Sequence, residues 1–327
     1  MSVLVTGAGG IGTYTARYLV DRGESVVLLD RRPARVAIGS VVDLARVRIV
    51  EGDVTDAAAL DRVIVDEGID RIVHTAAMLS TAIRENPVEG VRVNVMGTLS
   101  VLDLARRHRL KRLVIASSTT VGYPAFSTFV GTGFPEDFPM SVIAQRPTSI
   151  YAATKLSTEH LALLFRDIYG VSVAVLRYAA VIGPWSGPGT SIPGRLLTSL
   201  IEPARTGKRA VIEDPLLLWR GVEEFVDLRD CALANVAALF SSDPRSGVYN
   251  ISSGQALTLA DVIESVGEVF PGFSAELRVQ PKGGFAGFPH LRPAPSDIRR
   301  AADELDFHPH YRLIDSIRDL AAGLPKG

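Results

Sequence analysis

Two side chains that could exchange a proton with a substrate stand four residues apart near the middle of the chain. Tyr151 and Lys155 lead into a segment, 156–164, that predicts a helix, and residues four apart on a helix share a face. A free phenol has a pKa of about 10, and a nearby cation favours the phenolate. Tyr151 is therefore a candidate acid or base, with Lys155 lowering its pKa. The alternative is a surface helix with an unrelated Tyr and Lys, because this spacing is common by chance.

A glycine turn near the N-terminus suggests what those side chains act beside. Residues 2–6 predict a short buried strand, and residues 13–20 predict a helix. Between them, Gly7, Gly9 and Gly12 have the G-x-G-x-x-G spacing. In that setting the spacing allows a tight turn, close approach of the backbone to a pyrophosphate, and a helix N-terminus aimed at it. The turn therefore predicts a dinucleotide site.

The end of the next predicted strand bears on which dinucleotide is bound. Residues 25–29 predict a strand that ends on Asp30, where a carboxylate would accept hydrogen bonds from the ribose hydroxyls of NAD and repel the 2′-phosphate of NADP. Arg31 and Arg32 keep NADP open, because an adjacent guanidinium can bind that phosphate. An Asp that merely opens a turn is the alternative. We predict NAD.

Alternating strands and helices position these residues. Strands are predicted at 47–50, 71–74 and 113–116, and helices at 56–66 and 93–107. This alternation predicts a parallel sheet with helices on both faces, in which ligands bind beyond the carboxyl ends of the strands. The predicted fold class is α/β, a Rossmann-type doubly wound parallel sheet with a smaller C-terminal substrate-binding domain.

The predicted domain boundaries follow the pattern of strands and of Pro- and Gly-rich stretches. Residues 1–178 form the predicted dinucleotide-binding domain, and 222–250 return to it. The substrate-binding domain takes 179–221 and 251–327. Within it, 271–297 is rich in Pro and Gly, which leaves open a mobile flap over the substrate or a linker.

The combination of motifs resembles the extended short-chain dehydrogenase/reductase family, also described as NAD-dependent epimerase/dehydratases, over nearly the whole chain. Besides the glycine turn and Asp30, the resemblance rests on Gly52-Asp53-Val54, His74-Thr75-Ala76-Ala77, Asn94-Val95-Met96-Gly97-Thr98, Ser117-Ser118, Tyr151 with Lys155, and Leu176-Arg177-Tyr178. One departure is the turn itself, because the family usually spaces its glycines as T-G-x-x-G-x-x-G and this turn is one residue shorter.

The resemblance implies hydride transfer between a carbinol carbon and nicotinamide C4. Tyr151 would be the acid/base, Lys155 would bind the nicotinamide ribose and lower the pKa of the tyrosine, and Ser118 would orient the reacting oxygen. A strand-end Ser that caps the next turn is the alternative for Ser118. The cofactor-binding residues that the resemblance implies are Gly7, Gly9, Gly10, Ile11, Gly12, Asp30, Arg31, Asp53, Val54, Ala76, Ala77, Asn94, Tyr151, Lys155 and Tyr178.

Four further positions narrow the reaction that the resemblance implies. Thr119 and Thr120 stand where sugar-nucleotide dehydratases of the family carry an Asp-Glu pair, so elimination of water is not expected. Ala180 and Glu223 stand where nucleotide-sugar epimerases carry the Asn and the Arg that hold the diphosphate. An acid facing a diphosphate is repulsive.

Two arginines, Arg220 and Arg292, could take over the diphosphate. The leading hypothesis is nevertheless an NAD-dependent oxidoreductase acting on a secondary alcohol or carbonyl of a small polar substrate, such as a sugar acid or a polyol. An NAD-dependent sugar-nucleotide epimerase with tightly bound cofactor is the first alternative. A non-catalytic dinucleotide sensor is the alternative from another class.

Composition excludes several other kinds of function. The 327 residues carry a formal net charge of −1, which argues against electrostatic capture of nucleic acid or anionic membrane. Cys231 is the only cysteine, and the histidines lack ligand spacing, so we expect neither an internal disulfide nor a metal site. There is no signal-peptide pattern and no apolar run of about 20 residues, so we expect a cytoplasmic protein. Helices 93–107 and 156–169 correspond to those through which relatives commonly dimerise, and we expect a homodimer.

Overall fold

A computed structural model describes residues 1–188, 191–242 and 244–323. Among these residues, seven parallel strands form the central sheet in the order β10-β6-β5-β4-β1-β2-β3. Their bounds are β1 (Ser2–Thr6), β2 (Ser25–Asp30), β3 (Val47–Glu51), β4 (Arg71–His74), β5 (Arg112–Ser118), β6 (Val173–Tyr178) and β10 (Val248–Ile251). The chain reverses its direction of travel across the sheet between β1 and β4, which makes that point the topological switch.

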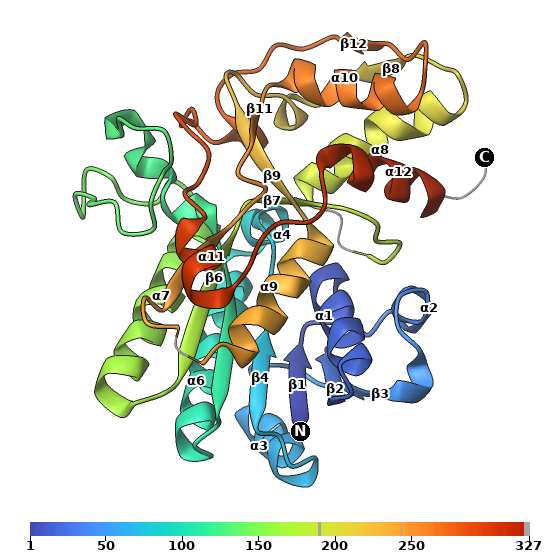
Figure 1. Ribbon diagram of the computed structural model, residues 1–327. Helices are drawn as coiled ribbons and strands as arrows, with labels where there is room; N and C mark the ends of the chain where they lie inside the picture. The colour runs from blue at the N-terminus through green and yellow to red at the C-terminus, as the bar shows by residue number, and fades with distance from the viewer. Residues whose placement is uncertain (189–190, 243, 324–327) are drawn as a thin grey trace.

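Helices cover both faces of this sheet (Figure 1). One face packs against α1 (Gly10–Asp21), α9 (Leu228–Phe240) and α11 (Arg299–Leu305), and the other against α3 (Ala57–Asp66), α6 (Gly97–Arg107) and α7 (Ile150–Tyr169). Successive side chains of β1 alternate between the two cores, with Val3 and Val5 on the α1 side and Leu4 on the α3 side. Because both faces are buried, the strands are almost continuously apolar. The predicted doubly wound parallel sheet is confirmed.

A smaller lobe lies beyond the carboxyl ends of the strands, at the top of Figure 1. It contains two small sheets, β11-β9-β7 and β12-β8. Its elements are β7 (Ala180–Ile182), α8 (Ile192–Arg205), β8 (Ala210–Ile212), β9 (Glu223–Asp227), β11 (Ala256–Leu257), α10 (Leu259–Val269), β12 (Ala275–Leu277) and α12 (Leu313–Gly323). Its core includes Leu196, Leu200, Trp219, Phe225 and Ile317, so residues far apart in sequence close one apolar cluster.

Short elements complete the described chain. They are the helices α2 (Arg35–Gly39), α4 (Ser80–Glu85) and α5 (Pro87–Val91), the π turn η2 (Arg92–Met96), and the 3-10 turns η1 (Leu44–Arg46), η3 (Thr119–Val121), η4 (Tyr123–Thr128), η5 (Pro215–Leu217) and η6 (Phe285–Gly287). The predicted helix 93–107 is thus a π turn followed by α6. Within the described residues, no helix is long and apolar enough to cross a membrane.

Several segments lie differently from the simplest division of the chain. Strand β9 pairs with β7 and β11 rather than with the central sheet, whereas α9 and β10 do return to that sheet. Ala301 and Leu305 of α11 belong to the core of the central sheet, although they follow the smaller lobe in sequence. Phe285, in the Gly-rich part of 271–297, is only 4% exposed and packs in the lobe core. The predicted domain boundaries themselves remain a prediction.

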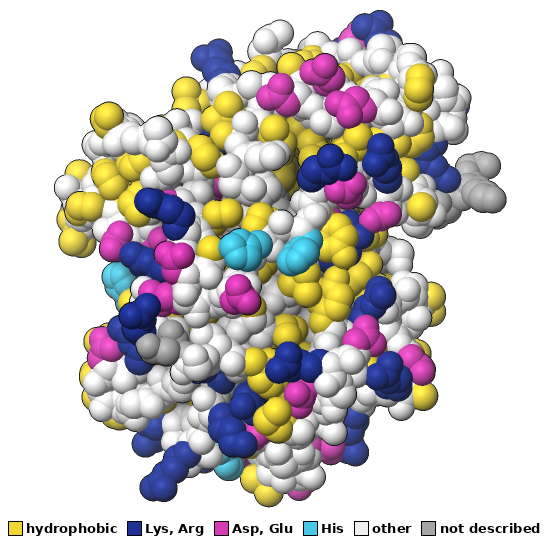
Figure 2. All heavy atoms as spheres, viewed as in Figure 1, with side chains coloured by type: hydrophobic (Ala, Val, Ile, Leu, Met, Phe, Trp, Pro, Cys, Tyr) yellow, Lys and Arg dark blue, Asp and Glu magenta, His cyan; other side chains and the backbone are white. Residues whose placement is uncertain are grey.

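The surface charge is mixed in sign. On the face in Figure 2, Lys and Arg side chains are interspersed with Asp and Glu rather than gathered into one basic patch. This agrees with the formal net charge of −1. Such a face does not offer the concentrated positive charge that binding to phosphate backbones requires.

Candidate active site

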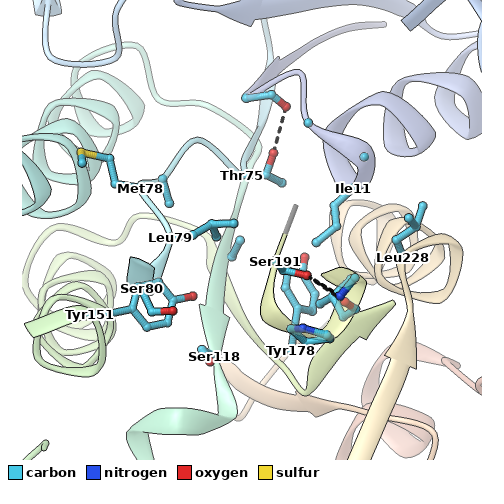
Figure 3. Close-up of a pocket in the computed structure, with 18 of the residues that line it drawn as sticks. Ile11, Thr75, Met78, Leu79, Ser80, Ser118, Tyr151, Tyr178, Ser191 and Leu228 are labelled. Atoms are coloured by element: carbon cyan, nitrogen blue, oxygen red, sulfur yellow. Dashed lines mark hydrogen bonds between the residues drawn. The ribbon is translucent and has the colours of Figure 1, made fainter. Parts of the chain in front are cut away.

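A cavity of about 770 Å³ lies at the topological switch point and extends into the smaller lobe. The central sheet lines it with the glycine turn and with the residues after β2, β3, β4 and β5. The smaller lobe lines it from α8, η6 and α12. Figure 3 shows Tyr151 and Ser80 on one side, Tyr178 and Ser191 on the other, and Ser118 near the end of a strand. The position is the one at which doubly wound sheets bind ligands.

The glycine turn passes so close to the neighbouring strand that side chains would not fit. Gly7 has φ +90°, and a Cβ built on it would lie 2.6 Å from the backbone nitrogen of Ala76. A Cβ on Gly12 would lie 1.9 Å from the carbonyl oxygen of Gly7. Helix α1 begins after Gly9, which gives its first turn no side-chain cap. The first N–H groups of α1 are therefore available at the cavity, which is what a pyrophosphate requires.

Asp30 braces this turn from the end of β2. Its Oδ2 accepts a hydrogen bond from the backbone N–H of Ala8 at 2.8 Å, and its Oδ1 accepts one from that of Arg32 at 2.8 Å. A carboxylate oxygen can accept more than one hydrogen bond, so Asp30 retains capacity for ribose hydroxyls. The guanidinium of Arg31 forms an ion pair with Glu89, with 3.3 Å between Nη1 and Oε1. Its charge is thereby partly neutralised.

The other residues predicted to bind a cofactor divide into two groups. All of them except Asn94 line the cavity. Asn94 is buried behind it, where its Oδ1 accepts from the backbone N–H of Met78 at 2.7 Å and its amide donates to the backbone oxygen of Met78 and to Thr154. Asn94 therefore fixes the backbone at Met78, which does line the cavity, and does not face a ligand itself.

Helix α7 carries Tyr151 and Lys155 into the cavity on its first turns. The side chain of Ser149 caps the helix by accepting from the N–H of Ala152, and Gly170 with φ +70° ends it. The Lys155 ammonium donates to the carbonyl oxygen of Ala116 at 2.7 Å and lies 5.8 Å from the centroid of the Tyr151 ring. Residues four apart on this helix thus reach one site, as the sequence predicts.

A buried ion pair fixes the same helix against the central sheet. Glu159, one turn beyond Lys155, binds Arg177 of β6 with 2.7 Å between Oε2 and Nη2. The hydroxyl of Ser117 donates to the other oxygen of Glu159 at 2.5 Å. These contacts join α7 to the ends of β5 and β6. The position of Tyr151 relative to Ser118 is therefore held by buried, charge-assisted bonds.

Burial shifts the pKa values of both candidate catalytic groups. Desolvation raises the pKa of Tyr151 to about 12, while a hydrogen bond with Ser118 acts in the opposite direction. Desolvation lowers the pKa of Lys155 to about 8, while the charge of Glu159 acts to raise it. Burial thus holds the pKa of Tyr151 above its ordinary value, and the effect of Lys155 on that pKa stays a prediction. At neutral pH the phenol is protonated and is a proton donor.

Thr120 orients the hydroxyl of Ser118. Its Oγ1 donates to Ser118 Oγ at 3.0 Å, and its backbone N–H lies 3.3 Å from the same oxygen. Ser118 thus caps the turn η3, as the alternative for this residue expected, while its own proton remains available to donate a hydrogen bond. Thr120 also lines the cavity. Neither Thr119 nor Thr120 can act as a carboxylic acid, and the expectation that elimination is not the reaction stays a prediction.

Glu223 and Arg292 form a buried cluster beside the cavity. The Nε of Arg292 lies 2.6 Å from Glu223 Oε1, and its Nη1 lies 3.0 Å from Glu224 Oε1. The Arg292 side chain is only 1% exposed, so it is committed to these carboxylates and does not line the cavity. Arg220 is exposed and donates to the backbone oxygen of Pro281 at 3.0 Å. Neither arginine lines the cavity.

Several lining residues were not predicted as site residues from the sequence. Thr75 binds the carbonyl oxygens of Thr6 and Gly7 at 2.9 and 3.1 Å and so anchors the glycine turn. Leu320 and Phe285 reach the cavity from segments more than 100 residues beyond Tyr151, and only the tertiary fold brings them there. Ser191 could have been found as an N-cap before a Pro. Among the described residues, no group of three His, Cys, Asp or Glu side chains could hold a metal ion.

Comparisons with known proteins agree with this geometry. A UDP-glucose 4-epimerase of Corynebacterium glutamicum is 29% identical, with 97% of this chain and 93% of the relative covered. A dTDP-glucose 4,6-dehydratase of Streptomyces antibioticus is 30% identical, with 100% and 91% covered. The crystal structure of Thermus thermophilus UDP-glucose 4-epimerase in complex with NAD is 26% identical, covers 99% of this chain and 98% of its own, and has a TM-score of 0.77. The model of the NAD dependent epimerase/dehydratase family matches residues 3–252, and the chain belongs to that family.

Proposed function

We propose that this protein is an NAD-dependent oxidoreductase that transfers a hydride at a secondary alcohol or carbonyl, with Ser118, Tyr151 and Lys155 as its catalytic residues. The observation that carries the proposal is that these three side chains line one cavity with the uncapped glycine turn. They reach the cavity from two different elements: Ser118 from the end of β5, and Tyr151 and Lys155 from α7. A sensor that only bound dinucleotide would have no use for this set.

The cavity fits an NAD molecule through residues of the central sheet. Gly10, Ile11 and Gly12 would hold the pyrophosphate with the N–H groups of the first turn of α1. Asp30 would accept the ribose hydroxyls, and the ion pair of Arg31 with Glu89 favours NAD over a cofactor with an extra phosphate. When bound, NAD⁺ accepts a hydride, that is one proton and two electrons, from the carbinol carbon, and NADH returns it.

Residues of this chain transfer the proton that the substrate oxygen gains or loses. In the reductive direction, Tyr151 donates its phenolic proton to the carbonyl oxygen while the hydride reaches the carbon, so the carbonyl becomes a hydroxyl. Ser118 donates a hydrogen bond to the same oxygen and orients it. Lys155 supplies positive charge near the phenolate that remains and thereby stabilises it. In the oxidative direction the phenolate takes the hydroxyl proton, and proton transfer of this type contributes roughly 10²–10⁴-fold to rate.

Reduction of NAD provides the direct test. Purified protein with NAD and a panel of secondary alcohols should produce the absorbance of reduced nicotinamide. Tyr151→Phe should lower kcat by roughly 10²–10⁴-fold, because it removes only the transferable proton. Tyr169→Phe is the matched control, since Tyr169 ends the same helix and is 55% exposed. Equal activity of Tyr151→Phe and wild type would refute the assignment.

An epimerase with retained cofactor is the second candidate. The two epimerases compared above support it, since one is related over nearly the whole chain and the other has the same fold with NAD bound. Such an enzyme reduces and reoxidises its own cofactor, so no net NADH appears. Denaturing the purified protein and assaying the supernatant for nicotinamide separates the two, because an epimerase should release nearly one equivalent and a dehydrogenase little.

We also propose a cytoplasmic homodimer, as the resemblance to the family suggests. Met96, Leu164 and Ile168 are 51%, 50% and 64% exposed on η2 and α7, where an apolar side chain has no core to enter. Helices α6 and α7 lie side by side in Figure 1. Covering such a row of apolar side chains with a second copy would stabilise both chains.

A further inference from the structure

We propose that the substrate end of this cavity takes an uncharged secondary alcohol or ketone on an apolar body, and not a nucleoside diphosphate sugar or a sugar acid. The inference rests on the proposed function, because it names the substrate class of the same site. Four features of the structure carry it: the cations of the lining, the capped helix that faces the substrate, the buried arginine cluster, and the apolar side chains of the smaller lobe.

The positively charged side chains that line the cavity already have partners within the protein. In the described part of the chain, Arg31 and Lys155 are the Lys and Arg side chains that line the cavity. Arg31 follows β2 at the glycine-turn end and pairs with Glu89. Lys155 is buried and donates to the carbonyl oxygen of Ala116. A substrate phosphate or carboxylate would therefore lose its hydration without gaining a cation, which is costly in a buried site.

The first turn of α8, the helix that faces the substrate end, offers few free N–H groups. Ser191 caps α8 by accepting from the N–H of Gly194 at 3.2 Å, as the dashed line in Figure 3 shows. Pro193, in the first turn of α8, has no N–H to donate. The Ser191 cap and Pro193 therefore remove two of the first-turn donors with which a helix can bind an anion. Helix α1, by contrast, has neither a side-chain cap nor a Pro in its first turn, which favours the cofactor end as the place for a phosphate.

The buried Arg292 is also unavailable to an anion. Arg292 lies between Glu223 and Glu224, at 2.6 and 3.0 Å, within the protein interior. Its charge is balanced by two carboxylates, so the cluster presents no positive potential to the cavity. Tyr123 lies between this cluster and the cavity, with its hydroxyl 3.4 Å from Glu223 Oε2. An anionic substrate would therefore gain no cation from this cluster.

The smaller lobe contributes apolar walls instead. Its share of the lining includes Ile192, Phe285, Phe288 and Leu320, joined by Tyr123. Hydroxyl groups at Ser80, Thr120 and Thr198 supply neutral hydrogen bonds. An apolar body packed against these walls is stabilised by about 0.8 kcal/mol for each buried methylene.

Calorimetric measurement of ketone binding to the enzyme loaded with NADH tests the inference. For a series of methyl ketones, we expect Kd to fall about fourfold for each added methylene, which is the value of 0.8 kcal/mol expressed as a ratio. A ketone of the same length that ends in a carboxylate should bind at least about tenfold more weakly. UDP and UDP-glucose should show no binding at about 1 mM.

A pair of variants on α8 provides the matched control. Thr198→Lys places a cation in the lining. The ratio of Kd for the carboxylate-ended ketone to Kd for the methyl-ended ketone should then fall by about tenfold or more. Ser199→Lys, at the next residue, does not line the cavity and should leave the ratio unchanged. Thermal unfolding of both variants establishes that the fold is retained.

The outcomes separate the inference from the proposed function. Micromolar binding of UDP or UDP-glucose, or a ketone series without length dependence, would overturn the inference. If UDP-glucose is converted and Tyr151→Phe abolishes the conversion, the catalytic assignment stands and the substrate class is wrong. If the ketones bind as expected but none is reduced, the substrate class stands and the proposed reaction is wrong.

Discussion

Replacing Arg292 by Met should destabilise the protein strongly, because two carboxylates would be left in the interior without their cation. The Arg292 side chain is 1% exposed, and those of Glu223 and Glu224 are 3% and 0% exposed. Removing one partner of a buried ion pair typically costs about 3–5 kcal/mol. With an unfolding entropy of about 2.1 cal/mol/K per residue, this corresponds to a fall in Tm of about 4–7 °C for a chain of this length.

The loss of stability in Arg292→Met should depend on pH. Burial raises the pKa of Glu223 above its ordinary value, and the charge of Arg292 opposes this rise. In Arg292→Met the opposing charge is gone, so the folded-state pKa rises further above that of the unfolded chain. A folded state that holds a proton the unfolded state releases gains stability as pH falls. The loss of Tm should therefore be larger at pH 8 than at pH 5.

Thermal unfolding followed by circular dichroism measures both effects. The control is Arg299→Met, because Arg299 is 85% exposed in its ion pair with Asp297 and should contribute little to stability. Adding Glu223→Gln and Glu224→Gln to Arg292→Met should recover much of the lost stability, since the unpaired charges are then absent. A variant that melts within about 1 °C of wild type, or with the same loss at both pH values, would refute the reasoning.

Four further predictions concern catalysis and assembly. Thr120→Val should lower kcat about fivefold with little change in KM, because it removes a hydrogen bond of about 1 kcal/mol that orients Ser118; an unchanged kcat would contradict this role. Since burial raises the pKa of Tyr151 to about 12, its phenolate fraction grows with pH, so kcat/KM for alcohol oxidation should rise above pH 7 and not fall. Lys155→Met should shift that rise to higher pH, and an unmoved profile would show that the lysine does not tune the phenol. Light scattering should give about twice the chain mass of 35.1 kDa, whereas the mass of a single chain would rule out the dimer.

Local features of the sequence were sufficient to predict much of the fold and part of the site. The strands, the glycine turn and the pairing of Tyr151 with Lys155 follow from short-range periodicity and steric limits. Parallel strands bring their carboxyl ends to one edge, so Asp30 and Ser118 could be expected near the same cavity. These features depend on a few neighbouring residues and on rules that hold for any doubly wound sheet.

Only the tertiary structure decided the environment of those residues. The pKa of Tyr151 depends on how completely the folded chain excludes water, and no spacing in the sequence reports that. Likewise, Arg292 could be read as a phosphate ligand until the fold placed it between Glu223 and Glu224. The walls of the substrate end come from Phe285 and other residues far from the motifs in sequence. The chemistry of the glycine turn and of α7 could be predicted from the sequence, because it depends on neighbouring residues. The surroundings of the substrate could not, because burial and charge pairing depend on contacts between segments that are distant in the sequence.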